Sequence, residues 1–286
     1  TSVSRGLGDV YKRQIIGLGL IGGSIAKSLS ANKFEVFAED PNKSYFDEAI
    51  KDKALVGSLD EINESKDLIL IICVPVSAHQ DVFLKHSNLL NSAKLVTDCS
   101  SVKNSVLDNL VKSGLDSKNY VFSHPMAGSE KSGYLNSNEK LFEDKTCLLM
   151  TGEATEESSL RLCKSLWQLL GSKISLIDLK DHDALLALTS HLPHLISFSL
   201  ISTLAELNLD SSRIFSGGGL KDFTRIASSD VKMWKDIFSS NNENISNAID
   251  KFVEKITLFK NYIVENDLEN IENFIEDAKN FRDKNL

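Results

Sequence analysis

The sequence is poor in cysteine, and its cysteines do not have the spacing of a metal or disulfide site. The four, Cys73, Cys99, Cys147 and Cys163, lie far apart along the chain, and none belongs to a CxxC pair. They fall in apolar or motif surroundings, which is typical of reduced thiols in a cytosolic protein. We therefore expect a cytoplasmic location, with neither a zinc or other metal site nor a structural disulfide.

The chain also lacks an excess of basic residues. It has 32 Lys and Arg against 40 Asp and Glu, which gives a formal net charge of −8. Phosphate backbones and anionic membranes attract basic surfaces, so this balance argues against nucleic acid and membrane as partners. A small-molecule substrate is the expected partner.

One stretch without formal charge, from Ala184 to Ala205, is long enough to cross a membrane. It contains His191, Pro193, His194, four serines and two threonines. Such polar content is costly in lipid but ordinary in a buried helix that lines a site. We expect the buried helix.

The N-terminal residues 1–14 have the character of a non-native leader. The segment TSVSRGLGDVYKRQ begins without Met and places Lys12, Arg13 and Gln14 where a buried first strand should be apolar. We therefore leave these residues out of the fold prediction and expect a shortened first strand that begins at Ile15.

Short apolar runs alternate with amphipathic segments between residues 15 and 178, and this pattern predicts a mostly parallel sheet covered on both faces. The runs are Ile15–Ile16, Glu35–Ala38, Leu68–Val74, Leu95–Thr97, Tyr120–Ser123, Cys147–Met150 and Ile174–Ile177. Residues 179–286 show only helical periodicity, including an apolar stripe. The stripe consists of Ile245, Ile249, Phe252, Ile256, Phe259 and Ile263. We predict an α/β fold in which an N-terminal Rossmann-type domain (15–178) precedes an all-helical substrate and dimerisation domain (179–286), with a homodimer formed through the helices.

Gly17, Gly19 and Gly22 form a GxGxxG motif between the first predicted strand and a helical run. In this setting the glycines permit a tight turn, a close approach of a pyrophosphate and close helix packing. Asp40 follows the second strand, where a carboxylate binds ribose hydroxyls and repels a 2′-phosphate, so NAD is favoured over NADP. The predicted cofactor-binding residues are Gly17, Leu18, Gly19, Leu20, Ile21, Gly22, Asp40, Val74, Pro75 and Ser100.

Polar residues gather at the ends of two further strands. Ser101 and His124 should meet at the carboxyl edge of the sheet, where a histidine accepts the proton of a substrate hydroxyl and a serine orients it. Arg225, in a glycine-rich segment of the helical domain, is suited to clamp a carboxylate, although an ion pair with Asp222 would also explain it. His182, next to Asp183, is expected to cap the long helix rather than contact substrate.

The segments GLGLIGGS, TDCSSVK, HPMAGSEKSG, SHLPH and GGGLKDFTRIASSD, in this order, resemble the prephenate and arogenate dehydrogenases of tyrosine biosynthesis. The match covers nearly everything from Ile15 onward. The resemblance implies oxidative decarboxylation of a cyclohexadiene, with His124 binding the ring hydroxyl and Ser101 supporting it. It further implies substrate-binding roles for Arg225, Ser129, Glu130, His191, His194, Gly218 and Trp234.

Prephenate carries two carboxylates, and the cations available in this acidic chain are Arg225, Lys103, Lys221 and the histidines. The absence of an acid at His194 favours prephenate, although Glu130 could serve the ammonium of arogenate. Two other functions stay open. A 3-hydroxyacid dehydrogenase would use a lysine such as Lys221, and a redox sensor would bind NAD without catalysis.

Overall fold

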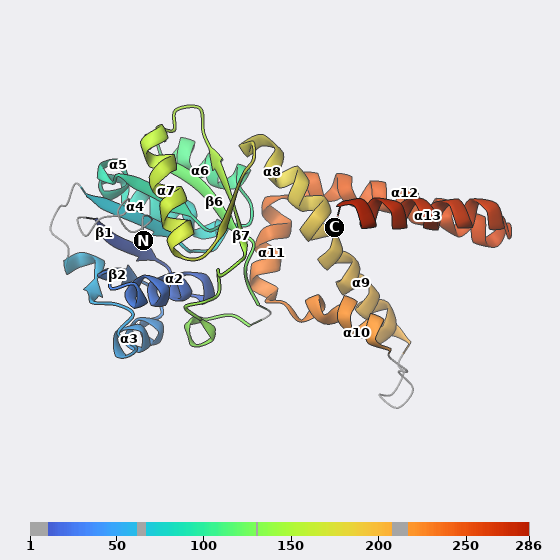
Figure 1. The fold of residues 1–286 in the computed structure, drawn as a ribbon, viewed down its shortest axis with the longest axis horizontal. Helices are drawn as coiled ribbons and strands as arrows, with labels where there is room; N and C mark the ends of the chain where they lie inside the picture. Colours follow the sequence, from blue (N-terminus) through green and yellow to red (C-terminus); the bar gives the residue numbers. More distant parts are fainter. Residues whose placement is uncertain (1–10, 62–66, 130, 208–216, 286) are drawn as a thin grey trace.

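The computed structural model describes residues 11–61, 67–129, 131–207 and 217–285. A sheet with flanking helices forms one body, and the helices from Leu179 onward lie to one side of it (Figure 1). The strands are β1 Lys12–Ile16, β2 Val36–Glu39, β3 Gly57–Ser58, β4 Leu68–Ile72, β5 Leu95–Asp98, β6 Tyr120–Pro125, β7 Thr146–Thr151 and β8 Lys173–Leu176. The helices of this body are α2 Leu20–Ala31, α3 Lys43–Lys51, α4 His79–Lys85, α5 Ser87–Ser92, α6 Asn104–Lys112 and α7 Glu157–Leu169. The predicted α/β class is confirmed.

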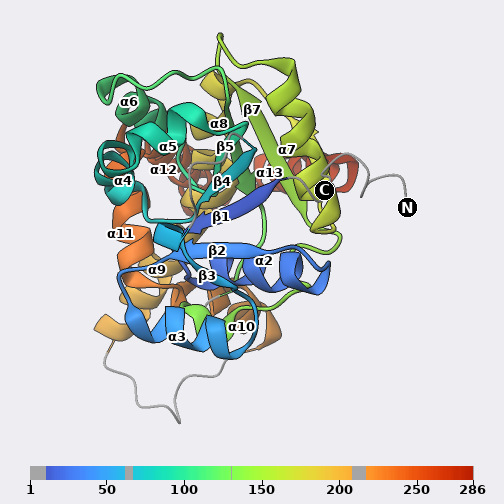
Figure 2. The same ribbon diagram turned by 90° about the vertical axis from the view of Figure 1, so that its left-hand side faces the viewer.

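The sheet has the strand order β3-β2-β1-β4-β5-β6-β7-β8, and β1 to β6 run parallel while β7 pairs antiparallel to β6. All five residues of β4 are buried, because helices cover both faces of the sheet. In Figure 2, α4, α5 and α6 lie on one side of the strands and α7 on the other. The strand order reverses between β1 and β4, and in such sheets the crevice at this point holds the ligand.

The first strand is longer than predicted. It begins at Lys12, and Arg13 pairs with Val36 on one side and Ile69 on the other, so the expectation of a shortened strand is wrong. Arg13 is only 2% exposed, and its guanidinium lies 3.7 Å from the centre of the Phe34 ring. A planar, weakly hydrated guanidinium can be buried against an aromatic face, which a lysine ammonium cannot do at similar cost.

The chain becomes helical at Leu179. α8 Leu179–Leu186, a π-helical turn Ala187–His191 and α9 Leu192–Glu206 follow one another directly, and then come α10 Gly218–Thr224, α11 Val231–Ser240, α12 Asn242–Val264 and α13 Leu268–Asn285. Within the described residues, Leu179–Glu206 is the one helix with the length and composition to cross a membrane; its most apolar stretch has a mean hydropathy of 1.5 and is 28% buried. Core helices of soluble proteins pass the same test.

The apolar stripe predicted after residue 245 divides into two parts. Ile245 is buried, and Ile249 and Phe252 pack against the same cluster. Farther along α12, Ile256 and Ile263 are 52% and 57% exposed. α12 and α13 project from the rest of the chain as a pair (Figure 1). Phe259 of the stripe packs on Phe274 of α13, while Ile256 and Ile263 stay largely exposed.

Candidate active site

The glycine motif forms a turn between β1 and α2 that only glycines can build. Gly17 has φ +97°, and a Cβ there would lie 2.5 Å from the carbonyl oxygen of Cys73. A Cβ on Gly22 would lie 1.9 Å from the carbonyl oxygen of Gly17. These two positions therefore need glycine for backbone conformation and for close packing, respectively.

Gly19, by contrast, faces open space. A Cβ at this position would meet nothing within 4 Å, and no side chain caps the helix that begins at Leu20. The amide groups of the first turn and the helix dipole favour an anion there. An open backbone at an uncapped helix N-terminus fits a dinucleotide pyrophosphate, with Leu20 and Ile21 in the first turn.

Asp40 is fixed beside this turn by two backbone amides. Its Oδ2 accepts a hydrogen bond from the amide of Leu18 at 2.5 Å, and its Oδ1 accepts one from Asn42 at 2.7 Å. Its neighbour Glu39 forms an ion pair with Lys85 and lies 3.4 Å from Nε2 of His86. Asp40 is therefore the carboxylate held against the glycine turn. Its role in binding the ribose stays a prediction.

The loops after β4 and β5 are joined by a histidine that sequence analysis missed. The fully buried His79 donates from Nδ1 to the carbonyl of Pro75 at 3.1 Å, so its Nε2 accepts from Ser100 Oγ, also at 3.1 Å. Burial lowers the pKa of His79, which keeps the ring neutral. Val74, Pro75 and Ser100 thus lie on two loops tied together at the carboxyl edge of the sheet.

His124 lies near the end of β6 and contacts a second histidine from the helical part of the chain. Its Nδ1 is 2.9 Å from Nε2 of His182, and Nδ1 of His182 is 2.7 Å from Oδ1 of Asp183. Asp183 also accepts hydrogen bonds from the backbone amides of Lys103 and Asn104, each at 2.8 Å. The expectation that His182 caps a helix is wrong, since it lies within α8 and is fully buried against His124.

This chain of bonds fixes the position of each proton. Burial raises the pKa of Asp183, but the hydrogen bonds from His182 and the two amides outweigh it, so the pKa falls and the group is a carboxylate. His182 then donates from Nδ1, and its Nε2 accepts from Nδ1 of His124. The remaining ring nitrogen of His124, Nε2, carries a lone pair.

His124 is also held neutral. Burial lowers its pKa well below the ordinary 6.5, and His182, Lys103 and His191 lower it further. A neutral imidazole with a fixed tautomer and a free lone pair on Nε2 is the arrangement that a general base needs. The site can therefore accept a proton at a defined atom.

Lys103 does not supply charge to a substrate, contrary to expectation. Its side chain is fully buried, and its Nζ pairs with Asp98 at 2.5 Å and donates to the carbonyl of Ser123 at 2.6 Å. The pair holds the ends of β5 and β6 together beneath His124. Ser101 lies in the loop after β5 but makes no hydrogen bond to His124 among the described residues, so its orienting role stays a prediction.

The helical domain brings aromatic and cationic groups to the same site. The His194 ring lies 4.0 Å from the Trp234 ring, and His191 meets Trp234 edge-on at 5.9 Å. Burial, followed by the nearby Arg225 cation, lowers the pKa of His194. The structure thus groups four of the predicted substrate residues.

Two buried donors in this group have no hydrogen-bond acceptor within the described part of the chain. One is Nε1 of Trp234 and the other is Nε2 of His191. Since Nδ1 of His191 lies 3.2 Å from the side-chain amide of Asn241, which donates, Nε2 carries the ring proton. Burial lowers the pKa of His191 to about 4, so the ring is neutral. Orphaned buried donors indicate a ligand with acceptor atoms.

The remaining predicted residues lie on segments around this group. Gly218 is the first residue of α10, which packs on α9, and it is exposed. Ser129 lies in the loop after β6, where its hydroxyl exchanges hydrogen bonds with the backbone of Lys131. Glu130 lies outside the described residues.

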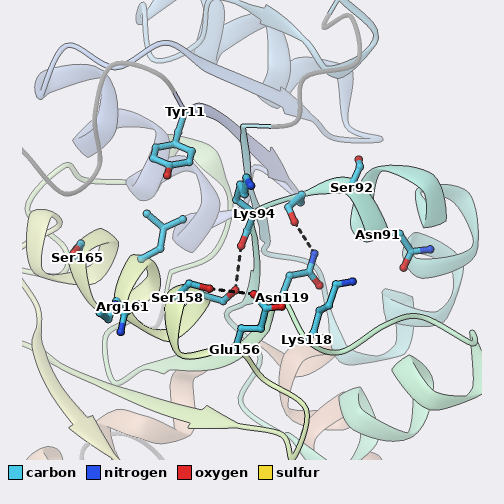
Figure 3. Close-up of a pocket in the computed structure, with 13 residues that line it drawn as sticks. Tyr11, Asn91, Ser92, Lys94, Lys118, Asn119, Glu156, Ser158, Arg161 and Ser165 are labelled. Carbon is cyan, nitrogen blue, oxygen red and sulfur yellow. Dashed lines mark hydrogen bonds between the residues drawn. The ribbon is translucent and has the colours of Figure 1, made fainter.

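A cavity of about 730 Å³ lies elsewhere (Figure 3). Tyr11, Lys94 and Asn119 line it, and they directly precede β1, β5 and β6. It therefore opens at the amino ends of the parallel strands, opposite the glycine turn and His124. Ligands of such sheets bind at the carboxyl ends, so this cavity is not the active site.

An α/β domain with a dinucleotide turn, joined to a helical domain that completes the same site, defines a two-domain dehydrogenase. The comparisons agree. Residues 25–176 match the family "Prephenate dehydrogenase, nucleotide-binding domain", and residues 178–277 match "Prephenate dehydrogenase, dimerization domain". The chain belongs to the prephenate dehydrogenase family.

Individual relatives cover most of the chain. A prephenate dehydrogenase of Bacillus subtilis is 32% identical over 94% of this chain and 74% of its own length. A cyclohexadienyl dehydrogenase of Zymomonas mobilis is 32% identical, with 88% of each protein covered. The crystal structure of prephenate dehydrogenase from Aquifex aeolicus with hydroxyphenyl propionate and NAD+ is 33% identical, with a TM-score of 0.85 over 96% of this chain and 98% of that one.

Proposed function

We propose that the chain is an NAD-dependent prephenate dehydrogenase that forms 4-hydroxyphenylpyruvate for tyrosine biosynthesis. The reaction takes hydride from the ring carbinol while the hydroxyl proton passes to a base. The ring carboxylate then leaves as CO2, its bonding electrons enter the ring, and the resulting phenolate oxygen takes the proton back. NAD, when bound, accepts the hydride. Aromatisation of the ring drives the reaction.

The observation that carries this proposal is the Asp183–His182–His124 chain at the carboxyl edge of the sheet. It leaves Nε2 of His124 as a proton acceptor beside the loops that follow β4 and β5. As the hydroxyl proton arrives, the imidazolium of His124 lies next to the His182–Asp183 pair, and that carboxylate stabilises the charge. Ser101 is the residue we assign to orienting the hydroxyl.

The substrate also needs partners for two carboxylates. The buried donors of His191 and Trp234 lack protein acceptors within the described residues, and the Arg225 cation acts on His194 nearby. We assign the carboxylates of prephenate to this group. Hydroxyphenyl propionate, bound in the Aquifex relative, shares the phenol ring and a side-chain carboxylate with the expected product, which supports the assignment. We also assign substrate-binding roles to Gly218 and Ser129, and to Glu130, which lies outside the described residues.

A second candidate substrate is arogenate, which has an ammonium in place of the side-chain keto group. We keep this candidate because one relative is named a cyclohexadienyl dehydrogenase, a name that is not limited to prephenate. The two substrates differ in the charge that His194 would face. Burial and the Arg225 cation lower the pKa of His194, so its ring is neutral and lies near a positive charge. Such surroundings repel the ammonium of arogenate and accept the keto group of prephenate, which favours prephenate.

The test is an assay of the purified chain with NAD and either prephenate or arogenate, followed at the NADH absorbance band and by CO2 release. We expect NADH and CO2 in equal amounts with prephenate, with little turnover when NADP replaces NAD. The His124→Asn variant controls for background oxidation. Dinucleotide binding without NADH from either substrate would instead support the non-catalytic redox sensor.

We also propose a soluble, cytoplasmic homodimer formed through the helical domain. The matched family name describes residues 178–277 as a dimerization domain. Exposed apolar residues on α9, α12 and α13 supply surface for such contacts, including Ile201, Ile256, Ile263 and Ile275. A dimer would also cover apolar parts of Leu179–Glu206 that are exposed in the single chain.

A further inference from the structure

Two cysteines lie side by side beneath the glycine turn, and the mechanism uses neither. Cys73 directly follows β4 and Cys99 directly follows β5. Ile72 and Asp98 are register partners in the parallel pair, and the amide of Cys99 donates to the carbonyl of Ile72 at 3.0 Å. The two Sγ atoms are 3.5 Å apart. The thiols are therefore in contact although 26 positions separate them in the sequence.

The backbone geometry suits a covalent link. Register partners on neighbouring strands are separated by roughly 4.8 Å, within the Cα separation of about 4.4–6.8 Å that disulfides require. We propose that Cys73 and Cys99 are a modification site. Hydrogen peroxide oxidises the two thiols to a reversible disulfide between them, and this disulfide weakens dinucleotide binding.

The chemistry takes two steps. The Cys73 thiolate attacks one peroxide oxygen, the O–O bond breaks, hydroxide leaves as water after protonation, and Cys73 becomes a sulfenic acid. Cys99 sulfur then attacks the Cys73 sulfur, the S–O bond breaks, and the hydroxyl leaves with the Cys99 proton as a second water. Two thiols are oxidised and one peroxide is reduced to two waters. A dithiol reductant reverses the reaction by exchange.

The order of these steps follows from the surroundings. Burial, and then the adjacent Cys73, hold the pKa of Cys99 well above its ordinary value, so Cys99 keeps its proton at neutral pH. We therefore assign the closing step to Cys99 and the first oxidation to its neighbour Cys73. Because closure needs loss of the Cys99 proton, the disulfide forms faster as pH rises.

Cys73 connects the thiol pair to the cofactor turn. Its carbonyl oxygen lies where a Cβ on Gly17 would clash, and its Cβ lies 3.1 Å from the place where a Cβ on Gly22 would be. A disulfide brings the sulfurs from 3.5 Å to about 2.05 Å, which moves the residue on which the turn rests. Cys99 also directly precedes Ser100. A shift of Cys73 therefore displaces the glycine turn, and a shift of Cys99 displaces Ser100. Both are predicted to bind the cofactor.

The test is to titrate the full chain with peroxide, map disulfides by mass spectrometry of proteolytic peptides, and measure NAD binding by calorimetry before and after. We expect a Cys73–Cys99 linked peptide, loss of two of the four thiols, an approximately tenfold weaker affinity, and recovery with dithiothreitol. Cys73→Ser and Cys99→Ser should each abolish the effect, while Cys163→Ser, a buried cysteine on α7, should retain it.

Two results would overturn the proposal. One is peroxide oxidation of wild-type chain that ends in sulfinic acid at Cys73 without a linked peptide. The other is a linked peptide with unchanged NAD affinity. Both are read on wild-type protein, so a variant that fails to fold does not obscure them. Neither depends on the substrate, so the proposal and the prephenate assay fail separately.

Discussion

His124 can act as a base only while its Nε2 is unprotonated, and the structure holds it in that state in two ways. The hydrogen bond to His182 directs the single ring proton to Nδ1. Burial lowers the pKa of the ring, so the neutral form prevails at physiological pH. The same burial makes the imidazolium costly, and the carboxylate of Asp183 behind His182 offsets that cost once the proton has been taken up.

The variant His124→Asn should lose turnover while still binding substrate. An amide cannot accept the hydroxyl proton, so kcat should fall by about a hundredfold or more, with a modest change in KM. Steady-state kinetics with NAD and prephenate measures both values. The control His86→Asn changes a histidine that directly follows α4 and makes no contact with His124, so it should keep near-normal kcat.

The pH dependence of kcat/KM follows from the lowered pKa of His124. A base works in its deprotonated form, so activity is present above the folded-state pKa and is lost as pH falls through it. Because this pKa lies well below 6.5, kcat/KM should be nearly flat between pH 8 and 6.5 and should decline only in more acidic buffer. A loss of half the activity already at pH 6.5 would mean that the pKa of His124 is not lowered.

The variant Arg225→Gln should act on binding rather than on the chemical step. Removing a cation that holds a carboxylate should raise KM for prephenate by about tenfold or more, with a smaller effect on kcat. The variant Lys232→Gln removes one exposed positive charge on the neighbouring helix and serves as the matched control. Equal changes in KM for the two variants would indicate a general electrostatic effect.

Single residues also show what sequence could predict. His124 was identified because its motif follows a strand directly, and strand ends meet at one edge of the sheet. His182 was misinterpreted because the neighbouring Asp183 resembles a local capping group, whereas its partner lies 58 positions away. His79 gave no signal at all. Contacts of this kind arise from tertiary packing, which local patterns do not encode.

At the scale of elements, the β1–α2 turn depends on three glycines for different reasons, and two substitutions separate them. Gly22→Ala places a methyl group 1.9 Å from a carbonyl oxygen, so the free energy of unfolding should fall by about 1–3 kcal/mol and NAD binding should weaken. In Gly19→Ala the new methyl group lies within 4 Å of no atom, so the free energy of unfolding should be unchanged. The methyl group occupies the space proposed for the pyrophosphate, so NAD affinity should fall about tenfold or more.

Thermal unfolding and calorimetry with NAD together distinguish these outcomes. The control Gly152→Ala has only an ordinary contact at 3.6 Å with Thr155 and should change neither quantity. Unchanged NAD affinity in Gly19→Ala would remove the glycine turn from the cofactor site. Greater stability in Gly22→Ala would contradict the packing described.

The elements themselves were predicted where a run was long enough to show a pattern. The seven predicted strands all appear, because each carries at least two consecutive apolar residues. β3 was missed, since Gly57–Ser58 has only two residues and no apolar run. The polar start of β1 was missed because its residues are buried through a cation–π contact and pairing with β2 and β4, which composition does not show.

At the scale of the whole molecule, the α12–α13 arm raises the question of what covers its apolar side chains. Phe259 and Phe274 stack at 4.7 Å and join the two helices, yet Ile256, Ile263 and Ile275 are each more than half exposed. The periodic stripe predicted the apolar face but not its division into a buried start and an exposed end. A second copy of the chain is the proposed cover, because one self-complementary surface suffices for a symmetric dimer.

The double substitution Ile256→Lys and Ile263→Lys should convert that dimer into a monomer. It places two like charges in the proposed interface, where symmetry repeats them on the partner, so association loses apolar burial and gains repulsion. Light scattering coupled to size-exclusion chromatography should report half the wild-type mass. Val111→Lys, on an equally apolar exposed position of α6, should keep the wild-type mass. A wild-type monomer would contradict the proposed homodimer. A double variant that stays dimeric would move the interface off this arm, and the exposed face of α9 would be the next place to substitute.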